Sequence, residues 1–302
     1  MGETRRMHYV PKTYLKNFSE KRGNEFFIYA VSKKAREKVF PTNITNICVE
    51  KDLYTLPGET ESSRQFIEKM YSDLYESDYD NIYKLLIDES KESLTTKERY
   101  SIVGFVVSMF YRNNSWNNFH NKFMDEVYAK GYHLTKANGK ESFFIEEQEI
   151  NIVGRSLEEL QKENHNQDKP LMALTALQKM LELTRMRFFN DVIAINKTSS
   201  DSEFITSDNP VSFRNEEVKR PIPVDPTNTL SIPIDSNHLL QLRSWGHELD
   251  KNMIGRLSGP ALINMVNSRI NNEFQLAQSD KFILGTKTAL HRFLQRPINK
   301  LL

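Results

Sequence analysis

A histidine and a tyrosine near the start of the chain stand where acid–base chemistry could occur. His8 and Tyr9 precede Val10 and Pro11. Proline disfavours a helical conformation of the residue before it, so we expect a stiff, extended segment that leads into a short helix carrying Asn17. Imidazole titrates near neutral pH, which makes His8 a candidate general acid or base. The alternative is structural, with His8 hydrogen-bonded to tie down the start of the chain.

A second polar segment lies in the last third of the chain. A strand-like stretch at residues 204–206 runs into Ser207, Asp208 and Asn209, and a proline ends it. Asp208 is a candidate general base, metal ligand or backbone cap. Its apolar neighbours would hold the carboxyl at the edge of the core, where desolvation changes its pKa. The same residue types also form ordinary turns through hydrogen bonds from side chain to backbone.

Further side chains would help such a site to bind its substrate. Arg112 follows the longest apolar run and either binds a phosphate or pairs with Asp208 or Glu68. Asn267 belongs to a set of asparagines spaced three and four apart, on one helical face that lines a cleft or faces solvent. We take His8 and Asp208 as the candidate catalytic residues, and we assign neither metal ligands nor a cofactor. The candidate substrate-binding residues are Tyr9, Asn17, Arg112, Ser207, Asn209 and Asn267.

The net charge of the chain is close to zero, so only a local group of basic residues could attract nucleic acid. The sequence has 41 Lys and Arg against 40 Asp and Glu, a formal net charge of +1. No global field therefore draws the protein to nucleic acid or to acidic lipid. A local patch for nucleic acid, or simply a solvated surface, is expected from the basic residues near the start: Arg5, Arg6, Lys12, Lys16, Lys21 and Arg22.

The cysteine content and the missing motifs narrow the class of protein. Cys48 is the only cysteine, which excludes an internal disulfide and a cysteine-based zinc site and indicates a reducing compartment. The first residues lack the apolar core of a signal peptide, and the longest apolar run, residues 102–111, is too short to span a membrane. We therefore expect a cytoplasmic protein without a membrane segment. Phosphate-loop, zinc-protease, nucleophile-elbow and kinase signatures are absent.

The elements that must position these residues follow from hydrophobic periodicity. The first sixty residues carry strand signals, and the middle third carries helical ones. One helix should begin at Thr95 or Thr96 and run toward Tyr128, with Gly131 as its stop. In the last third we expect a hairpin at residues 192–206, a second strand pair around an Asp235-Ser236-Asn237 turn, a helix at 262–276 and a strand at 282–284.

These elements predict an α+β fold. A mostly helical middle region would pack against a small mixed or antiparallel sheet formed by the amino-terminal and carboxy-terminal thirds. Residues 1–302 would form one compact domain or two lobes. In the second case, residues 1–60 and 191–302 make a β-rich lobe and residues 61–190 make a helical lobe.

Three of these segments also resemble a known family. The blocks are His8-Tyr9-Val10-Pro11 with Tyr14-Leu15 and Asn17-Phe18, then Val49-Glu50-Lys51-Asp52-Leu53-Tyr54, and Ile205-Thr206-Ser207-Asp208-Asn209-Pro210-Val211. Together they resemble the bacterial family called domain of unknown function (DUF) 4238, and the resemblance spans most of the chain. It implies a shared fold and a bacterial or phage setting, but no reaction.

Two functional hypotheses of different classes follow. The leading one is a phosphodiester-cleaving, nuclease-like effector of a conflict or defence system, with His8 and Asp208 as acid and base and Arg112 holding phosphate. The neutral net charge and the lack of a carboxylate cluster argue against it. The alternative is a non-catalytic module that binds a small ligand or a partner. A third hypothesis is that both polar segments have only a structural role.

Overall fold

The computed structural model describes residues 6–295 except 37, 59, 114, 200, 216, 219–224 and 245–249, and it leaves out the side chains of 115–117 and 119. The helices are α1 (Lys12–Leu15), α2 (Glu61–Arg64), α3 (Phe66–Tyr71), α4 (Tyr79–Ile87), α5 (Thr96–Tyr111), α6 (Ser115–Ala137), α7 (Leu157–Asn190), α8 (Ala261–Gln278) and α9 (Lys287–Gln295), with a 3₁₀ turn at Lys16–Phe18 and a π-helical turn at Ser72–Glu76. The strands are β1 (Arg6–His8), β2 (Glu20–Arg22), β3 (Glu25–Ser32), β4 (Val39–Asn43), β5 (Val49–Lys51), β6 (Ser142–Ile145), β7 (Gln148–Asn151), β8 (Asp191–Lys197), β9 (Thr206–Ser207), β10 (Ser212–Arg214), β11 (Thr229–Pro233), β12 (His238–Ser244), β13 (Ile254–Leu257) and β14 (Phe282–Gly285).

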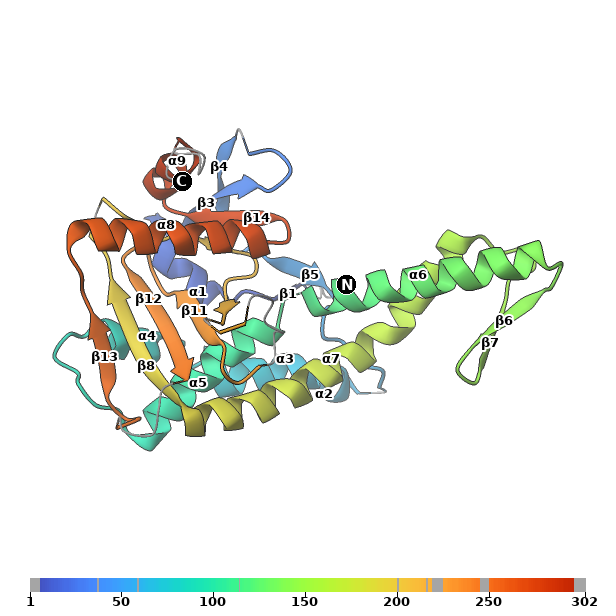
Figure 1. Cartoon of the computed structure of the whole chain (residues 1–302), viewed down its shortest axis with the longest axis horizontal. Coiled ribbons are helices and arrows are strands. Elements are labelled where there is room, and N and C mark those ends of the chain that lie inside the picture. Colours follow the sequence, from blue (N-terminus) through green and yellow to red (C-terminus); the bar gives the residue numbers. More distant parts are fainter. Residues whose placement is uncertain are drawn as a thin grey trace.

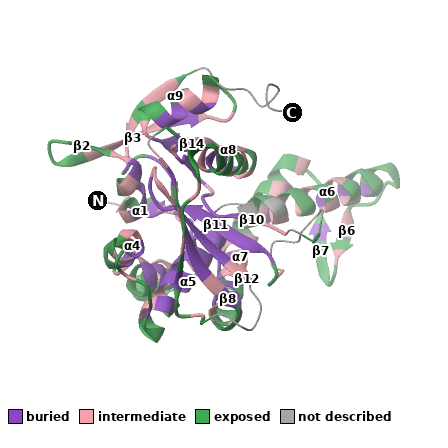
Figure 2. Ribbon diagram, turned by 60° about the vertical axis from the view of Figure 1, so that its left-hand side comes forward, coloured by how far each residue is buried: buried purple, intermediate pink, exposed green. Residues whose placement is uncertain are grey.

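Two five-stranded sheets hold the body together. The first has the order β10-β11-β12-β8-β13 and is antiparallel except where β13 runs parallel to β8. Its strands β11 and β12 are largely buried (Figure 2). The second has the order β2-β3-β14-β9, with β4 also paired to β3. The chain is therefore α+β as predicted, although its strands form several sheets rather than one small sheet.

One large apolar cluster joins residues from all three thirds of the chain. It contains Leu15 and Ile28 from the start, Phe105 from the middle, and Leu240 and Leu284 from the last third. Burial of such side chains contributes about 2 kcal/mol each, so this cluster is the main stabilising feature of the body. The division into two lobes stays a prediction.

An arm projects from this body (Figure 1). It consists of α6, the β6–β7 hairpin and the first half of α7. A separate small core lies within it, formed by Tyr128, Tyr132, Ile150, Ile152 and Leu160. No helix in the described ranges is both long and apolar enough to cross a membrane.

Glycine and arginine explain two differences from the predicted helices. The helix predicted from Thr96 to Tyr128 is two helices, because the chain breaks after α5, where Arg112 turns inward to bind other segments. Gly131 does not end a helix but lies inside α6. A Cβ built there would stand 2.6 Å from the ring of Phe143, so the missing side chain lets the β6–β7 hairpin lie against α6. The predicted cap at Thr95 is confirmed, with Glu98 completing a capping box.

The hairpin predicted at residues 192–206 is wrong. β8 pairs on one edge with β12 and on the other with β13, while β9 pairs with β14 in the second sheet. Local alternation of apolar residues marked both strands but could not indicate their partners. The strand pair around the Asp235-Ser236-Asn237 turn is confirmed as β11 and β12.

Candidate functional site

The segments that resemble the family meet in one region of the body. β1 pairs with β5, so that Met7 lies opposite Glu50 and His8 lies opposite Val49, and the Tyr9 amide donates to the carbonyl of Cys48 at 3.0 Å. Two non-glycine residues with left-handed backbone flank β5, Cys48 at φ 54° and Asp52 at φ 52°. Such conformations cost about 1 kcal/mol or more each and concentrate at sites where a segment must be held in place. Glu50 is therefore fixed in a tightly constrained strand.

Arg112 links the His8 segment to the helical turns that carry Tyr71 and Glu76, from inside the protein. Its Nη1 pairs with Glu76 at 2.5 Å and its Nη2 donates to the carbonyl of His8 at 2.7 Å, while the guanidinium lies 4.6 Å from the ring centre of Tyr71. Burial alone would lower the pKa of Arg112, but Glu76 and Tyr54 raise it. The predicted partner was Asp208 or Glu68, whereas the ion pair forms with Glu76.

Asp208 holds a backbone turn. Its carboxylate accepts hydrogen bonds from the amides of Asp280, Lys281 and Phe282 at 2.9, 2.7 and 3.0 Å, and its own amide donates to the carbonyl of Phe282. Burial raises the pKa of this carboxyl, and the three amides offset part of the rise. Asp208 thus fixes the backbone of Asp280 and Lys281, two exposed residues just before β14.

Ser207 and Asn209 extend this anchoring to α8 and to the end of α5. The Ser207 hydroxyl hydrogen-bonds to the side chain of Gln275 at 2.8 Å. The Asn209 amide group accepts from Asn113 at 2.8 Å and donates to the carbonyl of Gln278 at 3.1 Å. Both predicted binding residues are therefore occupied by protein partners.

His8 and Tyr9 face different surroundings, as neighbours on a strand do. Burial, followed by the charge of Lys12, lowers the pKa of His8 to about 4, and its buried Nε2 has no hydrogen-bond partner. Tyr9 is buried beside Cys48 and Asp208, and burial raises its pKa. The structure thus places Tyr9, rather than His8, next to Asp208. The catalytic roles of His8 and Asp208 stay predictions.

The remaining predicted binding residues lie elsewhere. Asn17 donates to the Tyr79 hydroxyl and to the carbonyl of Ile234, both at 3.2 Å. Asn267 is exposed on α8, where its carbonyl accepts from Asn271 at 2.8 Å. Neither meets the segments around Asp208.

The basic residues near the start are mostly engaged with their own surroundings. Arg22 pairs with Glu20 at 3.0 Å, Lys16 lies 5.0 Å from the ring centre of Phe26, and Arg6 donates to Asn46. Lys12 and Lys21 are exposed, and Arg5 lies outside the described residues. A role in nucleic-acid binding stays a prediction for this patch.

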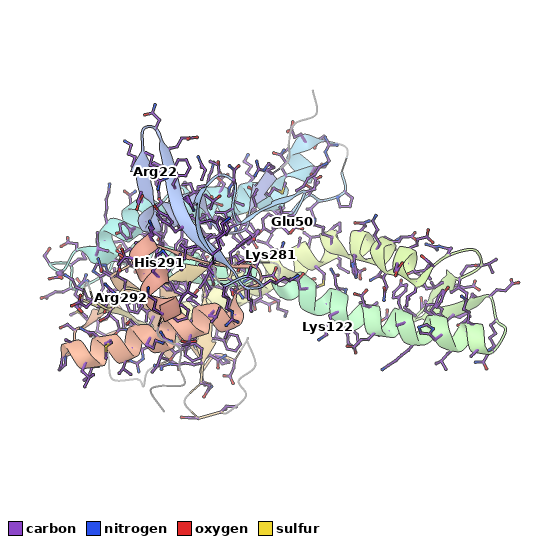
Figure 3. The ribbon with its side chains drawn as sticks, turned by 90° about the horizontal axis from the view of Figure 1, so that it is seen from above. Arg22, Glu50, Lys122, Lys281, His291 and Arg292 are labelled. Atoms are coloured by element: carbon purple, nitrogen blue, oxygen red, sulfur yellow. The ribbon has the colours of Figure 1, made fainter. Side chains whose placement is uncertain are left out.

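A polar cavity of about 380 Å³ lies where the arm meets the body, and we call it the arm-root cavity. Figure 3 shows two of its charged residues, Glu50 and Lys281, at this junction. Body and arm both contribute to its lining: Glu50, Asp280 and Lys281 from the body, and Asn118, Asn121, His165, Asn166, Lys169 and Met172 from the arm. The segments anchored by Asp208 and by the β1–β5 pair therefore supply its body wall.

The charges in the arm-root cavity are only partly paired. Lys169 lies 3.5 Å from the Glu50 carboxylate and donates to the carbonyl of Lys51 at 3.3 Å. Among the described residues, none forms an ion pair with the Lys281 ammonium. The cavity therefore offers a cation and several amide groups to a ligand.

Two histidine–aspartate pairs join the helices of the arm. Asp125 on α6 accepts from His165 Nε2 on α7 at 2.8 Å, and His120 on α6 meets Asp168 on α7 at the same distance. Sequence reasoning missed all four residues, because only the antiparallel pairing of two helices forty residues apart brings them together. In the described part of the chain, no group of three such side chains is arranged to hold a metal ion.

Comparison with known proteins places the chain in a family without assigning a reaction. No curated protein and no solved structure matches it. One family model matches residues 6–289, which include every segment that carries the resemblance described above. The chain belongs to DUF4238, a family of proteins of unknown function.

Proposed function

We propose that the protein is a binding module whose arm-root cavity takes a small polar ligand with an anionic group. The observation that carries this proposal is that the three family segments, far apart in sequence, all build or anchor the body wall of one polar cavity. Ligand sites of this size need a few fixed polar groups, and here Asp208 and the constrained β5 strand fix them.

The side chains in the cavity support this class of ligand. Lys281 supplies a cation that pairs with no carboxylate in the described part of the chain, and Lys169 makes two long contacts, to the Glu50 carboxylate and to the carbonyl of Lys51. Asn118, Asn121 and Asn166 offer amide donors and acceptors, which suit the edge of a base or the hydroxyls of a sugar. Nucleotides combine both features, so they are the first ligands to test.

Binding here would also couple the arm to the body. A ligand that contacts Lys281 and Lys169 at once bridges the body and the arm. Occupancy would therefore stabilise one arm position, which is how a sensor converts binding into a change that a partner recognises.

The experiment is a thermal-unfolding panel with nucleotides and inorganic phosphate. A ligand at one hundred times its Kd stabilises the folded state by about 2.7 kcal/mol, equivalent to a rise in Tm of roughly 4 °C for a chain of 302 residues. We expect Lys281→Ala and Lys169→Ala to abolish this rise. Lys21→Ala and Lys179→Ala, which remove lysines away from the cavity, should keep it. A rise that persists in both cavity variants would refute the proposed site.

Phosphodiester cleavage is the second candidate, and His8 favours it. Burial lowers the pKa of the His8 imidazole to about 4, so it is neutral at physiological pH, and its Nε2 could accept a proton from a substrate that reaches this buried atom. Asp208 would then act by positioning the turn before β14 rather than by moving a proton. A nuclease active in bacterial defence, working in the cytoplasm, fits this candidate, and the buried free thiol of Cys48 supports a reducing compartment.

Cleavage assays with labelled single-stranded DNA and RNA test this second candidate. We expect His8→Ala to lose activity while keeping the wild-type Tm, and His133→Ala, on the exposed surface of the arm, to keep activity. Equal cleavage by wild type and His8→Ala, or no cleavage by wild type, would refute the hypothesis that His8 catalyses phosphodiester cleavage.

A further inference from the structure

A second cavity lies over the first sheet. It measures about 230 Å³ and is lined by Glu89, Ile195, Lys197, His238, Arg256, Leu257 and Ser258. His238 begins β12, directly after the turn that joins it to β11. The neighbours of this histidine determine what the cavity can bind.

Asp235 holds His238 in one orientation. Its carboxylate lies 2.9 Å from His238 Nδ1 and accepts from the amides of Asn237 and His238 at 2.6 and 2.8 Å. The Tyr83 hydroxyl on α4 donates to the same carboxylate at 2.8 Å. Burial would raise the pKa of Asp235, but these donors, His238 first among them, outweigh burial and lower it. Asp235 is therefore an anion that binds the Nδ1 proton of His238 and leaves Nε2 for another partner.

The strand register gathers basic side chains on the same face. His238 lies opposite Lys197 of β8, and Arg256 of β13 lies opposite Ile195, two residues before Lys197. Residues two apart on a strand share a face, so His238, Lys197 and Arg256 point to the same side of the sheet. All three line the cavity.

Lys197 and Arg256 differ in what they can offer a ligand without breaking the fold. The Nη groups of Arg256 donate hydrogen bonds to the carbonyls of Leu86, Asp88 and Lys91 at the end of α4 and after it. Its Nε is buried and has no hydrogen-bond partner among the described residues. Lys197 pairs with Glu89, but both side chains are more than half exposed, so water and salt screen the attraction between them. Lys197 can therefore exchange Glu89 for a ligand at little cost.

We propose that this cavity is a binding site for a small oxyanion, of the phosphate or carboxylate class. The oxyanion lies between Lys197 and Arg256 and accepts a hydrogen bond from His238 Nε2–H when the imidazole carries a proton on both nitrogens. Lys197 and Arg256 outnumber the single carboxylate of Glu89 in the lining, so an anion is favoured over a cation. Ser258 adds a hydroxyl donor, and the volume leaves room for a small organic group on the anion.

The test follows the histidine signals of the isotope-labelled full chain by NMR during titration with phosphate. His238→Gln identifies the His238 signals by their loss. We expect these signals to shift saturably with phosphate or acetate and not with chloride at equal ionic strength. Lys197→Ala should weaken the apparent affinity about tenfold, as loss of a charge-assisted contact does, while Lys179→Ala, which removes a lysine that pairs with Glu182 away from this cavity, leaves it unchanged.

The outcomes separate this site from the arm-root cavity. If His238 shifts in Lys281→Ala as it does in wild type, the oxyanion site stands whether or not the arm-root cavity binds a ligand. Unmoved His238 signals with both phosphate and acetate, or an equal response to chloride, would overturn the proposal. Lys197→Ala binding as tightly as wild type would overturn it as well.

Discussion

The arm and the body each contain a histidine–aspartate pair at nearly the same distance, in different settings. In the arm, His165 and Asp125 lie 2.8 Å apart with side chains 32% and 36% exposed. In the body, His238 and Asp235 lie 2.9 Å apart with side chains 13% and 9% exposed. Asp125 is one acceptor on a helix surface, whereas Asp235 is surrounded by two amides, a phenol and an imidazole.

This difference shows that distance alone does not define what such a pair does. An exposed pair gains little from its attraction, because water screens it and both side chains lose rotamer freedom. A buried carboxylate that has lost its hydration depends on its remaining donors, so removing the charge or a donor has a large cost. We therefore expect the body pair to be fixed and the arm pair to exchange readily with solvent or ligand.

The largest expected effect comes from Asp235→Asn. The asparagine side chain has the shape of the aspartate, but its NH2 group faces the groups that donate hydrogen bonds to Asp235. We therefore expect the free energy of unfolding, measured by urea denaturation, to fall by about 3 kcal/mol. Asp208→Asn is the matched control, because Asp208 is also a buried carboxylate but accepts hydrogen bonds from backbone amides. If Asp235→Asn unfolds with the free energy of the wild type, the body pair contributes no more to stability than the arm pair.

The dependence of stability on pH also tests whether Asp235 stabilises the fold as an anion. Because Asp235 has a lower pKa folded than unfolded, its contribution is complete above the usual carboxyl range, near pH 4, and disappears as pH falls through its folded pKa. We expect the stability difference between wild type and Asp235→Asn to shrink steadily below pH 4 in urea titrations. A difference that stays constant down to pH 2 would contradict a lowered pKa.

A smaller effect should follow from Tyr83→Phe. This change removes one of the donors to Asp235 and leaves the ring in place, so we expect a loss of about 1 kcal/mol. Tyr100→Phe, at an exposed ring of α5, is the control and should change stability little. Equal stabilities of the two variants would mean that the Tyr83 hydroxyl does not support Asp235.

Local signals in the sequence predicted local features well. The cap at Thr95 and the turn at Asp235 were both predicted because the residues that define them are adjacent in the chain. The turn also contained a missed signal, since an aspartate three residues before a histidine can orient the ring. The convergence of the family segments was unpredictable, because Asp208 meets amides more than seventy residues away. The arm pairs likewise depend on a helix pairing that periodicity does not specify.

The smallest expected effect is that of Asp125→Asn, and it decides whether the arm pair is structural. The carboxylate is partly exposed and its partner His165 lines the arm-root cavity, so we expect a loss of no more than about 0.5 kcal/mol in the free energy of unfolding. Asp168→Asn, in the other arm pair, should behave in the same way. If the arm-root cavity binds a ligand, Asp125→Asn should weaken that binding more than it weakens the fold, because a freed imidazole no longer presents a fixed face to the cavity. A loss of 2 kcal/mol or more would instead place this pair in the same class as that of the body.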